Sequence, residues 1–214
     1  MKQSLAPTGT PEATAYLFSS PLGTVEFIEI DEDMAQLNDF CVHFLSATCA
    51  NIQELEHESR HGQGGVFQGI GGEELDISIE DVRDGAAVQL DVWQDTGEFL
   101  ARANCLLLLA CFTEKSLLSL CKGMDCGTPR ARPGQSKVAA CLDFLKEKGG
   151  LTFEEPELSI QVRKQCSQVR NFFAHGDWDN CREQVRRVEL PSAFAAVTSL
   201  LRAIEQAHTG HSAK

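Results

Sequence analysis

The sequence predicts a mainly helical fold, a bundle of four to five main helices with an irregular or short-β elaboration in its N-terminal part and loops. Over most of the chain, apolar residues recur every three to four positions, which is the period of an amphipathic helix. Glycine- and proline-rich pieces separate these stretches, and no segment has the strand pattern of a parallel sheet. A chain of 214 residues, 43% of them hydrophobic, can bury such a core without disulfides.

The N-terminal part is expected to be the irregular one. Residues 1 to about 20 are rich in Ser, Thr, Pro and Ala and predict a loose lead-in. TVEFIEID (24–31) alternates well enough for one short strand, with extended chain as the alternative. A helix is expected from residue 31 to residue 61, with acidic residues at its start, where the helix dipole favours them. Glycines then interrupt the chain, and residues 62–82 predict a loop or hairpin.

The C-terminal part predicts a regular bundle. Its central segment, LARANCLLLLACFTEKSLLSLC (100–121), is apolar on nearly all sides and therefore belongs in the middle of the core. The expected helices of this part are 84–122, 136–149, 156–176 and 188–208, with a basic, proline-containing loop at 122–136. We accordingly divide the chain into an acidic region, 1–82, that packs on the bundle, and a helical core, 83–210.

Charge is distributed unevenly along the chain. The formal net charge is −12, which argues against broad non-specific binding of nucleic acid. Residues 1–110 contain 4 Lys and Arg against 19 Asp and Glu, whereas residues 111–214 contain 15 against 12. The acidic half is either a solvated surface or a part that limits the access of a polyanion to the basic half.

The sequence predicts a cytoplasmic protein without membrane attachment. Its N-terminus lacks the basic start and apolar segment of a secretory signal. The apolar run LLLLAC (106–111) is far shorter than a segment that spans a bilayer.

Nine cysteines are expected to be reduced and to fill the core. Their number is odd, no C-x-x-C pair occurs, and most lie inside apolar helical patterns. A zinc site built from them would need a paired spacing that the chain lacks. Cys121 and Cys126 flank a loop and form the nearest candidate for a redox pair.

The segment QVRNFFAHGDW (168–178) carries the most informative polar residues. Arg170 stands beside the apolar stripe of the expected helix, and His175 lies in its last turn. Asn171 and His175 are four residues apart and face the same way, so the amide can hydrogen-bond one imidazole nitrogen and fix its tautomer.

Metal-independent RNA cleavage would use residues of these types. A base must take the proton of the 2′-hydroxyl, an acid must protonate the leaving oxygen, and a cation must neutralise the phosphorane. Histidine can fill either of the first two roles, and the planar fork of arginine fills the third. Two copies of the Arg170–His175 pair, brought together across a two-fold axis, would supply all the roles.

The pattern R-N-x-x-A-H at the end of the penultimate expected helix resembles the R-x(4–6)-H signature of the HEPN superfamily of helical ribonucleases. The matching positions are Arg170, Asn171 and His175, and the helix order from about 84 to 208 is similar. The resemblance implies a metal-independent endoribonuclease whose composite site forms in a homodimer, with no cofactor. It also implies a toxin or a phage-defence effector, restrained by an antitoxin or a defence-system partner.

Further residues are weaker candidates for the same site. Some HEPN proteins carry an acid and a base one turn apart on an earlier helix, which Glu98 and Arg102 would match, although such a pair is more often an ordinary surface ion pair. Glu114 lies within the apolar helix and needs a partner there. Basic residues that could hold RNA phosphates are Arg163, Lys164, Arg182, Arg186 and Arg187, with Arg130 and Arg132 on a loop that could close over the substrate.

One departure from the family concerns its regulation. Members paired with nucleotidyltransferase antitoxins often have a tyrosine two residues after the histidine, which the antitoxin modifies. Asp177 occupies that position, and the single tyrosine of the chain is Tyr16. Control by that chemistry is therefore not expected.

Three alternatives remain open at this stage. Arg170 could pair with Glu114 or Asp177 while His175 merely caps the helix, or the domain could be a dimeric adaptor that binds RNA, nucleotide or a protein without cutting. HESRH (57–61) also has the H-E-x-x-H spacing of zinc proteases. That segment is charged, ends at Gly62 and lacks a third ligand at a familiar spacing, so no metal is expected there.

Overall fold

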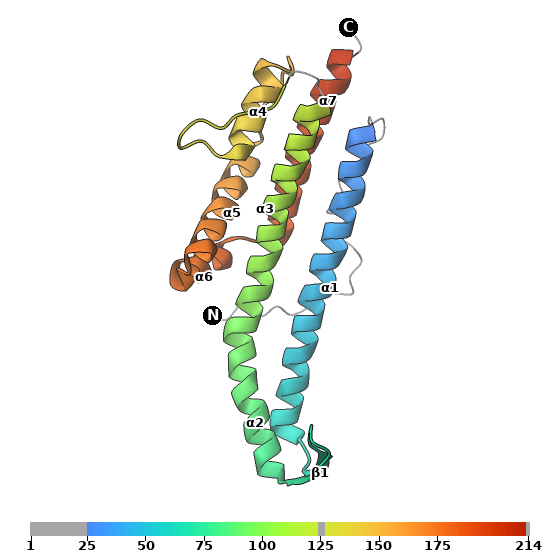
Figure 1. The fold of residues 1–214 in the computed structure, drawn as a ribbon, viewed down its shortest axis with the longest axis vertical. Helices are drawn as coiled ribbons and strands as arrows, with labels where there is room; N and C mark the ends of the chain where they lie inside the picture. Colours follow the sequence, from blue (N-terminus) through green and yellow to red (C-terminus); the bar gives the residue numbers. More distant parts are fainter. Residues whose placement is uncertain (1–24, 124–126, 213–214) are drawn as a thin grey trace. The chain divides into compact units, whose positions relative to one another are not determined.

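The computed structural model describes residues 25–123 and 127–212, and within them the chain is mainly helical with one two-stranded antiparallel sheet (Figure 1). The predicted mainly α fold with a short β elaboration is therefore confirmed. The lead-in predicted for residues 1–20, Tyr16 and Cys126 lie outside the described residues.

Two compact units make up the described chain. The first comprises residues 42–102, and the second comprises residues 25–41 and 103–212. The helices α1 (Val25–His61) and α3 (Glu98–Gly123) contribute residues to both. The boundary expected after residue 82 falls inside the first unit.

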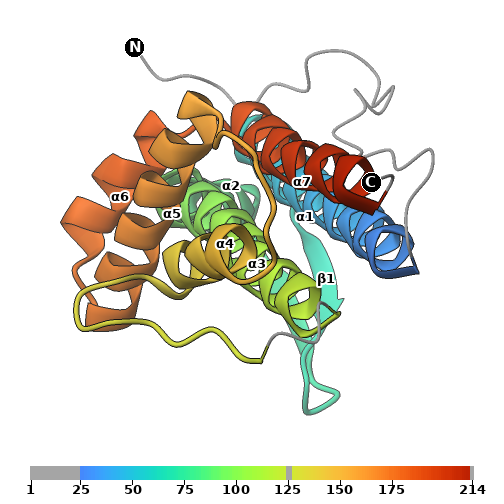
Figure 2. The same cartoon turned by 90° about the horizontal axis from the view of Figure 1, so that it is seen from above.

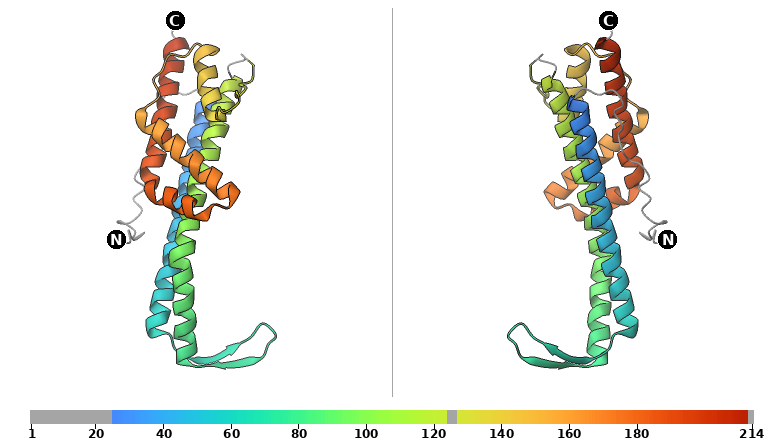
Figure 3. Two further views of the ribbon diagram at one scale, coloured as in Figure 1. Left: turned by 90° about the vertical axis from the view of Figure 1, so that its left-hand side faces the viewer. Right: turned by 90° about the vertical axis from the view of Figure 1, so that its right-hand side faces the viewer.

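In the first unit, a β-hairpin joins the end of α1 to α2 (Ile79–Val92) (Figure 3). Its strands, β1 (Gly65–Gln68) and β2 (Glu74–Ile77), pair with Phe67 opposite Leu75, so the expected hairpin is confirmed. Ser78 then caps α2, because its hydroxyl oxygen accepts a hydrogen bond from the Asp81 N–H at 3.1 Å.

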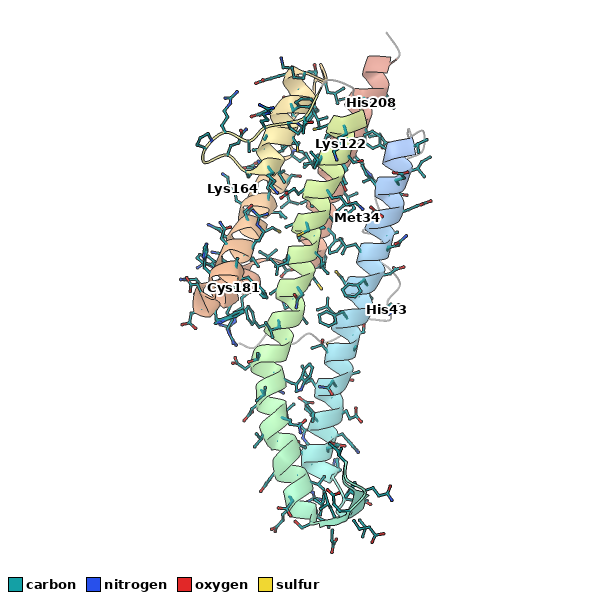
Figure 4. All side chains as sticks on the ribbon, viewed as in Figure 1. Met34, His43, Lys122, Lys164, Cys181 and His208 are labelled. Atoms are coloured by element: carbon teal, nitrogen blue, oxygen red, sulfur yellow. The ribbon has the colours of Figure 1, made fainter. Side chains whose placement is uncertain are left out.

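The strand predicted for residues 24–31 is wrong, because α1 already begins at Val25. Phe27, Ile30 and Met34 are buried at a spacing of three and four residues, which is the period of one helix face. The alternation of apolar and acidic letters in this segment is thus part of an amphipathic helix. Figure 4 marks Met34, which is fully buried on α1.

Helical structure continues from Ile79 to Gly123 through α2, a π-helical turn (η1, Trp93–Gly97) and α3. This confirms the long helix expected at 84–122 and extends its start. By length and composition the stretch could cross a membrane, and half of its most apolar window is buried within the structure. A central core helix has the same properties, and α3 holds fully buried residues such as Leu106, Leu109 and Leu117.

The second unit places α3 between two groups of helices (Figure 2). On one side lie α4 (Lys137–Glu147) and α5 (Glu157–His175), and on the other lie residues 25–41 of α1 and α7 (Leu190–Ser212). The hydroxyl of Ser159 on α5 donates a hydrogen bond of 2.6 Å to the Ala196 carbonyl on α7, which ties these two helices together. The helices expected at 136–149, 156–176 and 188–208 are therefore confirmed.

A short helix, α6 (Trp178–Arg187), was not predicted. Its sequence is too polar for a clear apolar period, and only Cys181 and Val185 are buried on it. The Cys181 thiol donates to the Val169 carbonyl at 3.7 Å, so α6 packs back on α5. Figure 4 marks Cys181 on α6 and Lys164 on α5.

The described cysteines are all free thiols, and most fill the core as expected. Burial raises the pKa of the Cys166 thiol to about 11, which keeps it protonated and unreactive at neutral pH. The buried ones are Cys41, Cys105, Cys121, Cys141, Cys166 and Cys181.

Gly176 ends α5 in the left-handed conformation, with φ of +69°. The N–H groups of Gly176 and Asp177 donate to the carbonyls of Phe173 and Phe172 at 3.2 and 2.9 Å, which satisfies the end of the helix. An alanine at this φ is strained by roughly 1 kcal/mol or more. We expect Gly176→Ala to lower the free energy of unfolding by about that amount in urea titrations.

The matched control for that substitution is Gly210→Ala in α7. Its added Cβ would meet nothing within 4 Å, and Gly210 has no positive φ. Alanine favours the helix there, so the control should leave stability unchanged or slightly higher. Equal destabilisation by both substitutions would contradict the assignment of Gly176 as a left-handed cap.

Asp31 on α1 is under electrostatic strain. Its Oδ1 is buried and has no hydrogen-bond partner among the described residues. Burial, and next the carboxylate of Glu205 on α7, raise the pKa of Asp31. A raised folded pKa means that the fold prefers the neutral acid. The stabilisation of the folded state by the neutral Asp31 carboxyl group is fully present below the unfolded pKa, near 4. It is lost as pH rises through the folded pKa.

We therefore expect Asp31→Asn to raise the melting temperature at pH 7 by a small amount, on the order of 1–2 °C. The difference from the unmodified chain should shrink as pH falls toward 3, which thermal scans across this pH range measure. Asp33→Asn is the matched control. It removes only the exposed ion pair with Lys115, at 2.7 Å, and should not raise the melting temperature.

Candidate functional site

The candidate site is built on the outer face of α5, opposite a narrow buried stripe. Val162, Cys166 and Val169 are buried along this helix, and Phe173 is half-buried at its end. Arg170 follows a fully buried residue and therefore points out of the core, where its side chain is 48% exposed. The burial of α5 thus sets the position of the arginine.

Arg170 forms an ion pair with Glu114 of α3. Its Nη1 lies 3.3 Å from Glu114 Oε2, and Lys137 at the start of α4 places Nζ 2.6 Å from the other carboxylate oxygen, Oε1. Glu114 is only 21% exposed, so its charge is held between two cations. This pairing satisfies the need for a partner that the sequence predicts for Glu114.

The pairing of Arg170 with Glu114 also has a consequence for chemistry. A guanidinium held by one carboxylate keeps further N–H donors, because the fork has five of them. Arg170 can therefore hold a phosphate oxygen while Glu114 fixes its position. The structure joins residues 56 positions apart in the sequence, which no local pattern could reveal.

His175 and Asn171 are both exposed on the last turns of α5. Neither side chain makes a hydrogen bond within the part of the chain that the structure describes. The orientation of His175 by Asn171 therefore stays a prediction. Asp177 forms no ion pair with Arg170 but caps α6. Its Oδ1 accepts a hydrogen bond from the backbone N–H of Asn180 at 3.4 Å, and its Oδ2 accepts one from the side-chain amide of Asn180 at 2.8 Å.

A cavity of about 40 Å³ lies beside this ion-pair network. Apolar and polar residues of α3, α4, α5 and α7 line it in similar number, and Glu114, Lys137 and Arg170 are among them. A cavity that binds benzene measures about 150 Å³. The space is therefore large enough for a water molecule but too small for a nucleobase.

The basic residues predicted to hold phosphates differ in their surroundings. Arg163 is engaged by Glu155 at 3.0 Å and is mostly buried, and Arg187 pairs with Glu183 on α6. Lys164 and Arg186 are exposed and form no ion pair within the described residues. A phosphate can reach these two most readily.

The remaining basic residues predicted to bind phosphate lie on α6 and on the segment before α4. Arg182 is half-buried on α6. Arg130 and Arg132 are exposed on the segment that precedes α4. Phosphate binding by all of these residues stays a prediction.

Glu98 and Arg102 belong to the first unit and lie at the start of α3. The acid that contacts Arg170 is Glu114, not Glu98. Glu98 instead lies near Cys49, where its charge adds to burial in raising the pKa of that thiol. Participation of Glu98 and Arg102 in the site stays a prediction.

The H-E-x-x-H segment forms the exposed end of α1. The rings of His57 and His61 are 5.0 Å apart, and Glu58 is exposed beside them. Across residues 25–123 and 127–212, no group of three or more His, Cys, Asp or Glu side chains is arranged to hold a metal ion.

Two residues that the sequence does not single out join the site region. Lys137 completes the ion-pair network, and Trp178 begins α6 directly after the motif. Ser136 accepts a hydrogen bond from the Ala139 N–H and so fixes the first turn of α4, where Lys137 lies. A helix cap can be read from the sequence, but the partner of Lys137 cannot.

Comparisons with protein-family models, with curated proteins and with solved structures found no match to this chain.

We expect the Glu114–Arg170 pair to contribute modestly to stability. Both side chains are partly exposed, so a double-mutant cycle with Glu114→Gln and Arg170→Gln should give a coupling of about 0.5–1 kcal/mol. The coupling should fall when urea unfolding is repeated at 1 M salt. The exposed Glu183–Arg187 pair is the control, at roughly 0.3–0.5 kcal/mol. A Glu114–Arg170 coupling of zero would contradict the ion pair.

Proposed function

We propose that this protein is a metal-independent endoribonuclease with a composite Arg/His site at a homodimer interface. The observation that carries the proposal is the arrangement of Arg170. Its guanidinium is anchored by Glu114 at 3.3 Å yet remains half exposed, on the same helix end as the exposed His175. An anchored cation and an exposed imidazole on the same end of one helix are suited to phosphodiester chemistry.

The reaction follows from the roles of the two side chains. A neutral imidazole of His175 removes the proton of the RNA 2′-hydroxyl, and the oxygen attacks the adjacent phosphorus. Arg170 donates hydrogen bonds to the phosphorane oxygens, whose negative charge grows in the transition state. The P–O5′ bond then breaks, and a protonated imidazole gives its proton to the leaving oxygen. The products are a 2′,3′-cyclic phosphate and a 5′-hydroxyl.

A dimer explains how a single histidine per chain serves two roles. One imidazole must be neutral and the other protonated, and each chain contributes one His175 from the exposed end of α5. Two α5 ends that meet across a two-fold axis would present both imidazoles and both Arg170 guanidiniums to one phosphate. The homodimer is therefore part of the proposal.

The proposed biological role also follows from the resemblance to the HEPN superfamily. A nuclease of this kind would act in the cytoplasm as a toxin or phage-defence effector, restrained by a partner protein until needed. Asp177 is engaged in capping α6, so the partner would act by binding rather than by modifying that position. No membrane association is part of this proposal.

A second candidate is a dimeric adaptor that binds RNA, nucleotide or protein without cutting. The observation that favours it is the absence of a side-chain hydrogen bond at His175 and Asn171 within the described residues, which leaves the imidazole unoriented. Arg170 would then serve as a binding residue alone.

The test is cleavage of a mixed RNA pool in excess EDTA. We expect His175→Ala and Arg170→Ala each to lower the rate by about 10²- to 10⁴-fold, because each removes a group that acts in the transition state. His61→Ala and Arg60→Ala are matched controls at the exposed end of α1 and should cut at the normal rate.

The outcomes of the cleavage assay distinguish the proposed nuclease from the alternative functions. Loss of cutting in EDTA together with sensitivity to His61→Ala would favour metal chemistry at the H-E-x-x-H segment. A folded dimer that binds RNA but never cuts it would favour the adaptor. Equal cutting by all five proteins would contradict the assignment of Arg170 and His175.

A further inference from the structure

Trp178 is a large aromatic side chain left partly on the surface beside the motif. It is 46% exposed, although an indole ring is among the side chains with most to gain from burial. It follows His175 by three residues, so their Cα atoms are at most roughly 11 Å apart. The left-handed turn at Gly176 fixes the start of α6 at this corner.

The indole of Trp178 is held in place rather than loose. Phe173 on α5 packs against it in an edge arrangement, with ring centroids 5.2 Å apart and planes at 80°. Phe173 is itself half-buried, which anchors the pair to the core of the second unit. A supported, partly exposed aromatic ring is the form that proteins use to stack unpaired bases.

Two arginines of α6 lie in the same row as this ring, while the residues directly beside Trp178, Asp177 and Asp179, are acidic. Residues 178, 182 and 186 are each four apart and therefore form one gently twisting row along the helix. That row carries Trp178, Arg182 and Arg186, and borders the buried side formed by Cys181 and Val185. Arg186 is exposed and has no ion-pair partner within the described residues.

The cavity beside Arg170 cannot serve as the base site, because its volume of about 40 Å³ is too small for a nucleobase. An exposed aromatic ring is another means of holding a base next to a phosphate. Trp178 is the aromatic side chain that α6 offers there.

We infer that Trp178, supported by Phe173, is a stacking platform for one unpaired nucleobase, with Arg186 holding a phosphate further along the same strand. The substrate class is accordingly single-stranded RNA, since the bases of a duplex are stacked on each other and unavailable. This inference rests on the proposed nuclease function and names its substrate class.

The two tryptophans of the chain allow a direct test by fluorescence. Trp93→Phe leaves Trp178 as the only indole, and Trp178→Phe leaves Trp93 as the matched control. The probe is a 2′-O-methyl hexaadenylate, which cannot be cut because its 2′-oxygen carries a methyl group. Tripolyphosphate, which has charge but no bases, and a blunt duplex of the same sequence are compared at one salt concentration.

The expected result is quenching by the single-stranded probe in the Trp93→Phe protein, and none in the Trp178→Phe protein. The duplex and tripolyphosphate should not quench. Fluorescence anisotropy of a labelled probe should show binding weakened by roughly 5- to 150-fold in Trp178→Ala, with less loss in Trp178→Phe, which keeps a ring.

Several results would overturn the inference. These are probe binding without quenching of Trp178, equal quenching by tripolyphosphate, and no probe binding at all. Dissociation of the dimer by Trp178→Ala with unchanged probe affinity would assign Trp178 to a second copy of the chain instead.

The cleavage assay in EDTA, run on the same proteins, separates this inference from the proposed function. Cutting without quenching of Trp178 would overturn the stacking platform and leave the nuclease standing. Quenching without cutting would support the platform and overturn the nuclease, so the site would belong to an RNA-binding adaptor.

Discussion

Helix α5 is held in the second unit by one narrow stripe of buried side chains: Ser159, Val162, Cys166 and Val169. Because the stripe is narrow, every other position of the helix faces outward or lies at its border. Arg170 is exposed for this reason, and so are Asn171 and His175. The hydrogen bond from Ser159 to the Ala196 carbonyl fixes α5 along α7 and thereby fixes which turn reaches Glu114. The polar site is a consequence of how little of α5 is buried.

Glu114 has a double role in this arrangement. As a structural residue it neutralises Arg170 and Lys137, so that three helices meet at one charged point. As a site residue it restrains the guanidinium without occupying all its donors. The same contact therefore serves the fold and the proposed site, and stability measurements alone do not distinguish the two roles. Substrate-dependent measurements at Arg170 do so, because only they report on the remaining donors.

Much of the fold could be predicted from the sequence, since long amphipathic periods and glycine-rich breaks are local signals. The start of α1 was missed because Val25 and Phe27 alternate with acids over too short a stretch to separate strand from helix. Helix α6 was missed because few of its side chains are buried. The outward position of Arg170 follows from the spacing of its apolar neighbours.

The partners within the site were harder to predict. Contact of Arg170 with Glu114 could be named only as one option among carboxylates, and contact of Glu114 with Lys137 could not be named at all. Such pairs depend on which helices lie side by side, and a single sequence does not record that. Trp178 gave no periodic signal because it starts a helix that the sequence pattern did not reveal.

The second unit is assembled from two stretches of chain, residues 25–41 and 103–212, separated by the whole first unit. During synthesis, α1 leaves the ribosome long before the helices it packs with, and α7 is the last of these helices to be made. Phe27 of α1 meets His208 of α7 at a ring distance of 5.9 Å, a contact that spans almost the entire chain. Such long-range closure is slow and cannot begin until both helices have been made. The burial that positions Arg170 is therefore completed only after α7 has been synthesised. A chain with this topology has no assembled second unit while only its first helices have left the ribosome.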